Sequence, residues 1–410
     1  MNTQDLIKRE AAVCAHTYEP LSVVLCKGKG VWLWDIEGKK YLDMMTAYSA
    51  ISFGHGHPRL LKALIEQAQK VAVPSRAFYS DQLAPFLEKA CALSGFNMGI
   101  PMNTGAEAVE TAIKVARRWG YEIKGIPENK AEIIVANNNF HGRTTTIISF
   151  STESLYQKGF GPLTPGFKAI PFGETKALEE AITQNTCAVL IEPIQGEAGI
   201  ILPSKGYLKE VRRLCTTKNV LLLLDEVQSG LGRTGKLFAF QHEDIQPDGL
   251  ILGKALGGGL LPISLFLSRH DILSVMTPGS HGSTFGGNPL ACAVAREALA
   301  LLEEERLDKR AAELGTYMLE RLKNIRSPLI KEVRGMGLWI GVDLHKHLVS
   351  ARKVCEKMCL RGVLSKDTHE TVIRFAPPLI ITREEIDFAL DVFEVVLKEI
   401  EKQESKPNLT

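Results

Sequence analysis

The sequence predicts an α/β protein with a large, mostly parallel sheet and a second, smaller α+β domain. Short apolar runs such as Val220–Leu224 and Leu250–Leu252 are typical of strands that are buried on both faces, as in parallel sheets. An amphipathic stretch with helical spacing, such as residues 106–120, lies between such runs. From about residue 306, helical stretches alternate with short strands, which indicates a compact α+β unit.

We expect three segments along the chain. Residues 1–45 contain a small antiparallel meander, because residues 22–45 alternate apolar and polar positions around two polar turns. This segment should contribute to the small domain. Residues 46–290 should form the large domain, and residues 291–410 the C-terminal small domain, which a long helix starting at Asn288-Pro289 joins to the large one.

The composition excludes several functional classes. The chain has 410 residues, 45% of them apolar, which is ample for a large core. Its 49 basic and 47 acidic residues give a formal charge of +2, so no basic excess indicates binding to nucleic acid or anionic membranes. No apolar run approaches a membrane span, and the amino terminus lacks the apolar core of a secretory signal. The eight scattered cysteines indicate reduced thiols, so we expect a cytoplasmic protein.

Two pairs of residues could suggest a metal site. His55 and His57 are separated by one glycine but lack a third ligand. Cys355 and Cys359 share a helical face but lack a matching ligand pair. We therefore assign no metal to this protein.

The most informative residues are Asp225 and Lys254, each at the end of a predicted buried strand. The glycines at 257–259 form a stretch that is too flexible for a helix, so we expect Lys254 at the end of a strand. The two charges could form an ordinary salt bridge. Alternatively, Lys254 forms a Schiff base with pyridoxal phosphate while Asp225 keeps the pyridine nitrogen protonated, which makes the ring an electron sink.

The motif DEVQSGLGRTG, which begins at Asp225, and the later GKALGGG, which contains Lys254, resemble the class III (omega) aminotransferases. The similarity runs through nearly the whole chain. It implies pyridoxal phosphate as cofactor, the fold of aspartate aminotransferase type (fold type I), and a homodimer with shared active sites. It further implies transfer of the delta-amino group of L-ornithine to 2-oxoglutarate. The products would be glutamate and glutamate 5-semialdehyde, which cyclises to pyrroline-5-carboxylate.

The same resemblance assigns a phosphate site. Gly105 and Ala106 follow Thr104 at the predicted start of a helix, where free N–H groups and the helix dipole suit an anion. By resemblance they bind the cofactor phosphate. Ser283 and Thr284 match residues that reach the phosphate bound to the neighbouring subunit.

Other residues are assigned by resemblance to the cofactor ring. Phe140 and His141 are similar to the aromatic pair that covers one face of the pyridine, although some relatives carry tryptophan at the second position. Gln228 is similar to the residue that donates to the phenolic oxygen. Glu192 is similar to the residue that orders the floor of the site near Gln228.

The resemblance also assigns six substrate-binding residues, one of which is Glu192. Tyr18 and Arg143 would hold the ornithine carboxylate, since a guanidinium suits bidentate carboxylate recognition. Arg374 would bind the alpha-carboxylate of 2-oxoglutarate or glutamate, and Glu197 would pair with Arg374 when ornithine is bound. Tyr48 favours a substrate with a polar alpha-amino group, because aminobutyrate enzymes carry a smaller aliphatic residue there.

Three alternatives stay open. The chain could transfer the amino group of N-acetylornithine or 4-aminobutyrate instead, and Tyr48 is the main residue that separates these substrates. An aminomutase of the same fold would need no 2-oxoglutarate. A non-catalytic module that binds pyridoxal phosphate would show a fused DNA-binding segment or a lost lysine, and the sequence shows neither.

Overall fold

The computed structural model describes residues 2–404 and is built around a seven-stranded sheet. The strand order is β4-β10-β9-β8-β7-β5-β6. The pairs from β9 to β6 are parallel, whereas β10 is antiparallel to both of its neighbours. The predicted large, mostly parallel sheet is therefore confirmed. Its strands are β4 (Met98–Met102), β5 (Glu132–Ala136), β6 (Phe167–Ile170), β7 (Thr186–Ile191), β8 (Leu221–Asp225), β9 (Gly249–Leu252) and β10 (Ser264–Ser268).

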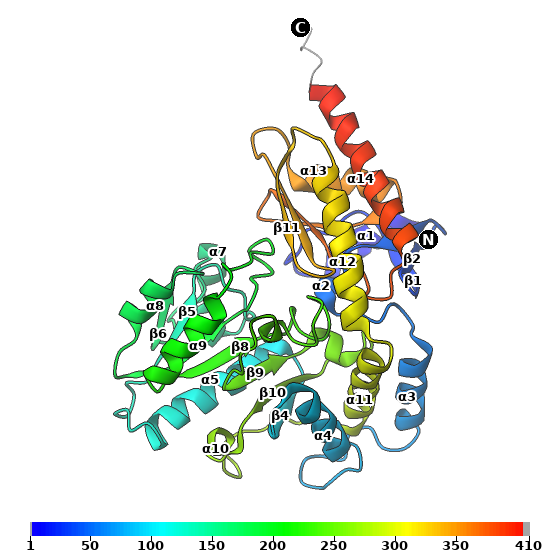
Figure 1. Cartoon of the computed structure of the whole chain (residues 1–410). Helices are drawn as coiled ribbons and strands as arrows, with labels where there is room; N and C mark the ends of the chain where they lie inside the picture. The colour runs from blue at the N-terminus through cyan, green and yellow to red at the C-terminus, as the bar shows by residue number, and fades with distance from the viewer. Residues whose placement is uncertain (1, 405–410) are drawn as a thin grey trace.

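Both faces of this sheet are covered, which explains the continuous apolar runs. Along β8, Leu221 and Leu223 pack into one core cluster with the helix α5 (Gly105–Glu122), whereas Leu222 and Leu224 pack into another with α9 (Tyr207–Thr217). Side chains alternate along a strand, so one leucine-rich strand supplies both cores. Figure 1 shows α5 and α9 beside the green strands of this sheet.

Two four-stranded sheets make up the rest of the β structure. One has the order β1-β2-β3-β13 and joins the predicted N-terminal meander to a C-terminal strand. The other has the order β11-β12-β15-β14. Figure 1 shows the blue N-terminal strands next to the orange and red C-terminal elements. The strands are β1 (Leu25–Lys29), β2 (Trp32–Asp35), β3 (Lys40–Asp43), β11 (Ile330–Gly335), β12 (Ile340–Leu344), β13 (Val363–Leu364), β14 (Lys366–Thr368) and β15 (Val372–Phe375). The domain boundaries at residues 45 and 290 stay a prediction.

The predicted long helix is α11 (Pro289–Glu304). The Asn288 side chain caps it by accepting a hydrogen bond from the Ala291 N–H at 2.9 Å. The chain then turns at Arg306, whose φ is 51°, into α12 (Leu307–Asn324). The other helices are α1 (Thr3–Val13), α2 (Thr46–Ser49), α3 (Pro58–Ala68), α4 (Leu83–Ser94), α6 (Thr145–Ile148), α7 (Ser154–Gln157), α8 (Thr175–Ala181), α10 (His270–Leu273), α13 (Ala351–Leu360), α14 (Arg383–Glu404), and the 3-10 helices η1 (Ala239–Glu243) and η2 (Lys254–Gly257).

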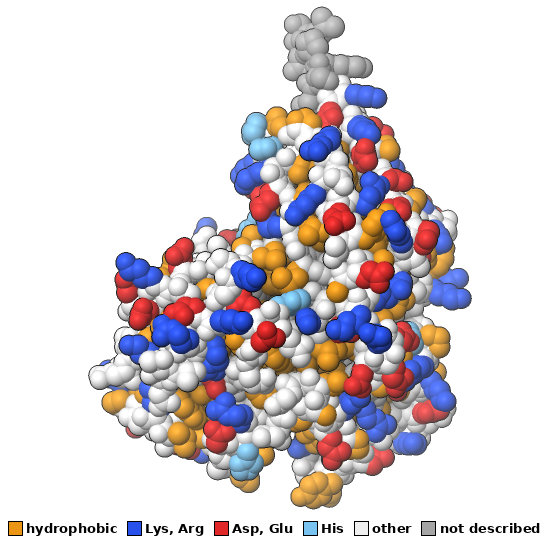
Figure 2. Space-filling model, viewed as in Figure 1, with side chains coloured by type: hydrophobic (Ala, Val, Ile, Leu, Met, Phe, Trp, Pro, Cys, Tyr) orange, Lys and Arg blue, Asp and Glu red, His pale blue; other side chains and the backbone are white. Residues whose placement is uncertain are grey.

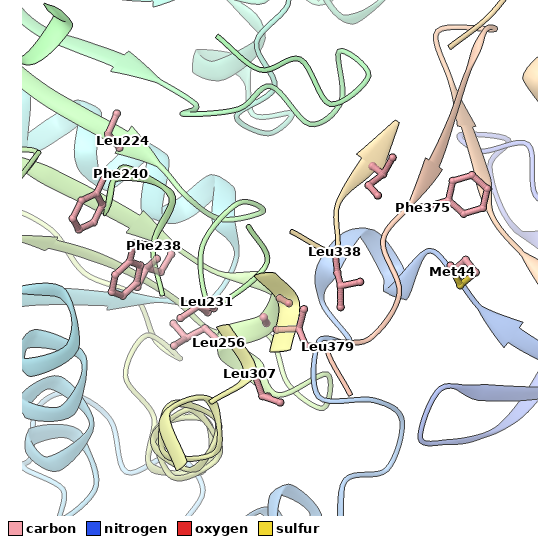
Figure 3. Close-up of a cluster of buried hydrophobic side chains, with 14 of the residues drawn as sticks. Met44, Leu224, Leu231, Phe238, Phe240, Leu256, Leu307, Leu338, Phe375 and Leu379 are labelled. Carbon is pink, nitrogen blue, oxygen red and sulfur yellow. The ribbon is translucent and has the colours of Figure 1, made fainter. Parts of the chain in front are cut away.

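A single apolar core connects the large sheet to the small ones. In Figure 3, Leu224 of β8 and Phe375 of β15 lie at opposite ends of one cluster, with Leu231, Leu256 and Leu379 between them. Because this core is continuous, the strand ends of the large sheet and the β15 strand are held in a fixed relation.

A buried arginine reinforces this junction. The side chain of Arg233 is fully buried and donates hydrogen bonds to the carbonyls of Leu338 (2.9 Å) and Pro377 (2.6 Å) and to Ser52 Oγ (3.0 Å). Burial lowers the pKa of Arg233 to about 9, and the charge of Asp43 opposes the shift. The guanidinium thus links the loop after β8 to the segments around β12 and β15.

The surface agrees with the nearly balanced charge. On the face shown in Figure 2, Lys and Arg side chains are interspersed with Asp and Glu. Within residues 2–404, no helix combines the length and the apolar character that crossing a membrane requires.

We predict that Gly315→Ala destabilises the fold. A Cβ at Gly315 in α12 would lie 2.1 Å from the backbone carbon of Gly337, so backbone must move. Overpacking at such a site costs about 3 kcal/mol. The melting temperature of Gly315→Ala should be clearly lower than that of wild type. Thr316→Ala, on the exposed side of the same helix, should melt close to wild type. Equal melting of Gly315→Ala and wild type would contradict the close contact.

Candidate active site

Four parallel strands deliver polar side chains to one edge of the large sheet. Asp225 ends β8, Lys254 follows β9, Glu192 follows β7, and Phe140 and His141 follow β5. Carboxyl ends of parallel strands meet at the same edge, which is where open α/β sheets bind ligands. A cavity of about 190 Å³ lies there. It is lined by Gly105, Ala106, Phe140, His141, Gly142, Glu192, Ile194, Asp225, Val227, Gln228, Ser229 and Lys254.

Asp225 is buried and both of its oxygens accept hydrogen bonds. His141 Nδ1 lies 2.7 Å from Asp225 Oδ2, and the Val227 N–H donates to Oδ1 at 3.0 Å. Burial alone would lower the pKa of His141, but the hydrogen bond and charge of Asp225 outweigh it, and the pKa is raised. His141 therefore supports the negative charge of Asp225, a contact that the sequence did not predict.

Lys254 begins the 3-10 helix η2, so the prediction that the glycines at 257–259 lie outside a helix is wrong only for Gly257. The helix ends at Gly257, and Gly258 and Gly259 then adopt positive φ angles of 61° and 73°. Lys254 itself has a φ of 45°, a strained value for a residue with a side chain. Burial lowers the pKa of its ammonium, although nearby Glu197 and Asp225 oppose the shift. A larger neutral fraction leaves more of the amine available to act as a nucleophile or to accept a proton.

Glu192 lines the cavity. Its carboxylate accepts the N–H groups of Phe140 at 3.0 Å and Gly196 at 3.3 Å. Burial raises its pKa to about 7, and Asp225 adds to this, while His141 and the two N–H donors oppose it. Gln228 lies close to Gly196, because a Cβ at Gly196 would lie 2.4 Å from Gln228 Oε1. Glu192 and Gln228 both line the cavity.

The N-terminus of α5 opens onto the same cavity. Thr104 caps the helix in a capping box with Glu107. The first intrahelical donor is the Ala108 N–H, so those of Gly105 and Ala106 precede the helical hydrogen bonds.

Four lining residues were not predicted from the sequence: Gly142, Ile194, Val227 and Ser229. The position of Val227, two residues after Asp225, was the available signal. A Cβ at Gly105 would lie 3.2 Å from a Val227 methyl group, and one at Gly253 equally close. Glycine at these positions therefore leaves the cavity open.

Three predicted substrate residues meet next to the cavity. Arg374 in β15 donates to Glu197 Oε1 at 2.7 Å, and its guanidinium carbon lies 4.7 Å from the centre of the Tyr48 ring. Arg374 is nearly buried, whereas the Glu197 side chain is 23% exposed. Burial raises the pKa of Tyr48, with Arg374 opposing and Glu197 and Tyr18 adding to the rise. The charges of Glu197 and Arg374 both reach Lys254.

The other predicted contacts lie further out. Tyr18 is 82% exposed but lies close enough to Tyr48 to affect its pKa. Arg143 is exposed, with its guanidinium carbon 3.7 Å from the centre of the Tyr156 ring. The structure brings neither of them into the lining of the cavity.

Ser283 and Thr284 do not line this cavity either. Ser283 Oγ accepts hydrogen bonds from the Gly286 N–H at 3.0 Å and from Asn103 Nδ2 at 2.9 Å. Asn103 lies just before the start of α5. Thr284 is exposed and lines a separate cavity of about 490 Å³ formed by residues 73–80, 83–84, 87, 284 and 286–289.

Comparisons with known proteins identify the family. Residues 13–397 match the class III aminotransferase family, and the chain belongs to it. Curated relatives include the ornithine aminotransferase of Halalkalibacterium halodurans, which is 57% identical over 97% of this chain and 99% of its own. Ornithine aminotransferase 2 of Staphylococcus aureus is 58% identical over 92% of this chain and 94% of its own.

Solved structures give the same family. The ornithine aminotransferase of Toxoplasma gondii, described with pyridoxal phosphate at partial occupancy in its active site, superposes with a TM-score of 0.97. It is 44% identical, over 99% of this chain and 96% of its own. The acetylornithine aminotransferase of Elizabethkingia anophelis has a TM-score of 0.89 and 46% identity, over 97% of this chain and all of its own.

The cofactor of this family is pyridoxal phosphate, and the lining of the cavity fits it. Lys254 offers an amine for the cofactor aldehyde, and Asp225 offers a carboxylate for the pyridinium nitrogen. The α5 N-terminus offers N–H donors for the phosphate, and all three surround one cavity. The glycines facing Val227 leave room for a flat ring.

We predict that His141→Asn changes stability in a pH-dependent way. The raised pKa of His141 means that its charged contact with Asp225 is fully present below pH about 6.5 and is lost as the pH rises through the raised value. Asparagine can keep a hydrogen bond but not the charge. Without cofactor, the variant should melt at a lower temperature than wild type, and the difference should be larger at pH 6 than at pH 9. His347→Asn, at an exposed histidine, is the control. Equal differences at both pH values would refute the charged contact.

Proposed function

We propose that this enzyme is an ornithine aminotransferase: it transfers the delta-amino group of L-ornithine to 2-oxoglutarate and produces glutamate and glutamate 5-semialdehyde, which cyclises to pyrroline-5-carboxylate. The observation that carries the proposal is the Glu197–Arg374 ion pair beneath Tyr48, next to Lys254. Relatives named ornithine aminotransferase at 57% identity over nearly the whole chain support it.

The cofactor residues have separate tasks in this proposal. Bound pyridoxal phosphate supplies an electron sink for the carbon that carries the transferred amino group. Asp225, supported by His141, holds the proton on the pyridine nitrogen. Lys254 Nζ binds the cofactor and moves the proton at the reacting carbon. Gly105 and Ala106 hold the phosphate through their N–H groups.

The remaining ring contacts complete the cofactor site. Phe140 covers one face of the pyridine, with His141 next to it in the chain, and Gln228 donates to the phenolic oxygen. Glu192 fixes the Phe140 backbone through its hydrogen bond at 3.0 Å. These contacts hold the plane of the ring, so the reacting bond keeps its alignment.

Two substrates must bind in opposite ways. Ornithine presents its distal amine and keeps its alpha-carboxylate away from the cofactor, where Tyr18 and Arg143 hold it. Glutamate presents its alpha-amine with a carboxylate beside the cofactor, on Arg374. Glu197 masks Arg374 for ornithine and is replaced by the incoming carboxylate of glutamate. This exchange trades one charge-assisted pair for another, so its net cost is small.

We also propose a homodimer in which Ser283 and Thr284 complete the phosphate site of the partner subunit. The exposed aromatic side chains near Thr284 support it: Phe78 is 71% exposed, Tyr79 is fully exposed, and Phe285 is 55% exposed. Together with the 490 Å³ cavity they form an apolar surface of the kind that marks an interface. The purified enzyme should sediment as a dimer.

The state of the cysteines supports a cytoplasmic location, which we propose as well. All eight lie within the described residues, and each of them is a free thiol there. Five are buried. Such thiols suit a reducing compartment.

A second substrate remains a candidate because of one comparison. The acetylornithine aminotransferase of Elizabethkingia anophelis is 46% identical to this chain, no less than the Toxoplasma enzyme. N-acetylornithine has the same distal amine but an uncharged alpha-nitrogen. The Tyr48 hydroxyl is the group whose hydrogen bonding distinguishes the two.

A comparison of amino donors tests the function. Steady-state kcat/KM should favour ornithine over N-acetylornithine and 4-aminobutyrate. Tyr48→Ile removes the hydroxyl, and loss of a hydrogen bond in a closed site costs about 1–3 kcal/mol. Ornithine should therefore lose activity relative to 4-aminobutyrate in this variant. A wild-type preference for N-acetylornithine would reject the proposal.

We predict that Glu197→Ala exposes Arg374 permanently. Stopped-flow measurements should show a faster half-reaction with glutamate, and ornithine should react through its alpha-amine more often. Glu210→Ala, which removes a partly exposed glutamate paired with Arg213 on α9, is the control. If the ratio of glutamate to ornithine rates does not change, the pair is a structural salt bridge.

A further inference from the structure

Tyr48 lies on the short element α2, whose backbone forms a left-handed turn. Thr46, Ala47, Tyr48 and Ser49 are consecutive residues with positive φ angles of 52°, 45°, 60° and 74°. None of them is glycine, although residues with a Cβ rarely adopt this region and almost never in succession. Such strain persists only where surrounding contacts impose it, and it concentrates at functional sites.

Asp43 fixes the start of this left-handed turn. Its Oδ1 accepts hydrogen bonds from the N–H groups of Met45 at 3.0 Å and Thr46 at 2.8 Å. Its Oδ2 lies 2.8 Å from His55 Nε2, which gives this histidine a structural partner. Asp43 is buried, so these bonds are protected from competing water.

The turn is also tied to the strand that carries Arg374. The Thr46 hydroxyl donates to the Ala376 carbonyl at 2.7 Å, and the Ala376 N–H donates to the Met44 carbonyl at 2.7 Å. Thr46 is fully buried. The turn therefore moves only if the chain two residues beyond Arg374 moves with it.

Ser52 closes the end of the turn. Its hydroxyl donates to the Ser49 carbonyl at 3.1 Å and accepts from Arg233 Nη2 at 3.0 Å. The Leu379 N–H donates to the Ser52 carbonyl at 2.8 Å. Both ends of the turn are thus bound to the segment that follows Arg374.

We propose that the left-handed turn Thr46–Ser49 is the element that sets substrate selection, and that Asp43, Thr46 and Ser52 act as positioning residues for it. The turn holds the Tyr48 ring 4.7 Å from the carbon of the Arg374 guanidinium, the group assigned above to the glutamate carboxylate. A relaxed backbone would place Tyr48 elsewhere and leave Arg374 less well fixed. The proposal rests on the proposed function and adds the residues that maintain it.

Two variants should loosen the turn, and a third variant is their matched control. Thr46→Val keeps the shape and the β-branch but removes the hydroxyl that reaches Ala376. Ser52→Ala removes the two hydrogen bonds of the Ser52 hydroxyl at the other end of the turn and keeps the backbone bond to Leu379. Thr46→Ser keeps the hydroxyl and is the conservative control. Thermal melting of each variant establishes that it is folded at the assay temperature.

Selectivity and binding are then measured separately. In Thr46→Val and Ser52→Ala, the ratio of kcat/KM for ornithine to that for 4-aminobutyrate should fall about 10-fold, mainly through the KM for ornithine, because misplacement of a contact group weakens binding. Glutarate, an unreactive dicarboxylate, should bind about 5-fold more weakly by calorimetry, because Arg374 is less well placed. Thr46→Ser should keep wild-type values.

A purely structural role predicts a different result. The variants would melt earlier but lose activity equally with both donors and bind glutarate normally in their folded fraction. Either finding in both variants overturns the proposal. If wild type does not prefer ornithine, the proposed function fails, but the glutarate affinity still reports whether the turn positions Arg374. The two failures are thus distinguishable.

Discussion

The parallel pairing of β5, β7, β8 and β9 is the constraint on which the site depends. Parallel strands end at one edge, so the residues that follow them are neighbours whatever their distance in sequence. Asp225, Lys254, Glu192 and His141 reach the same cavity for this reason. The helices on both faces keep the strands buried, and the α5 N-terminus adds anion-binding groups at the same edge. The sheet and α5 therefore position these residues, and the loops between the strands do not need to be rigid by themselves.

The site holds charges of both signs in alternation. Asp225 lies against His141, and Glu197 lies against Arg374, while Lys254 is within range of both acids. Buried pairs of this kind contribute little net stability, but removing one partner leaves the other uncompensated. Their value is therefore positional: each charge restricts where its partner, and the ligand that displaces the partner, can lie.

Local sequence patterns predicted several features of this structure. The apolar run before Asp225, the capped start of α5 and the Asn288-Pro289 helix start depend on neighbouring residues, so the sequence alone predicts them. The ion pair of Glu197 with Arg374 was predicted only by family resemblance, because 177 positions separate the two residues.

Other features could not be predicted in this way. Nothing in the residue types at 46–49 indicates positive φ, because contacts with Asp43 and Ala376 impose it. The hydrogen bond between His141 and Asp225 joins two strand ends, and its geometry depends on the register of the sheet. The 3-10 helix that begins at Lys254 ends on the first of the three glycines, a residue for which the sequence predicted no helix.

The bond between Thr46 and Ala376 spans 330 positions of the chain. Strand β3 likewise pairs with β13, far towards the other end. A ribosome that adds roughly 5–20 residues per second needs some tens of seconds to bridge such a separation. During synthesis the large sheet can therefore form first, while the first strands wait for their partners. The Tyr48 side of the pocket is completed last, when the newborn chain is nearly finished.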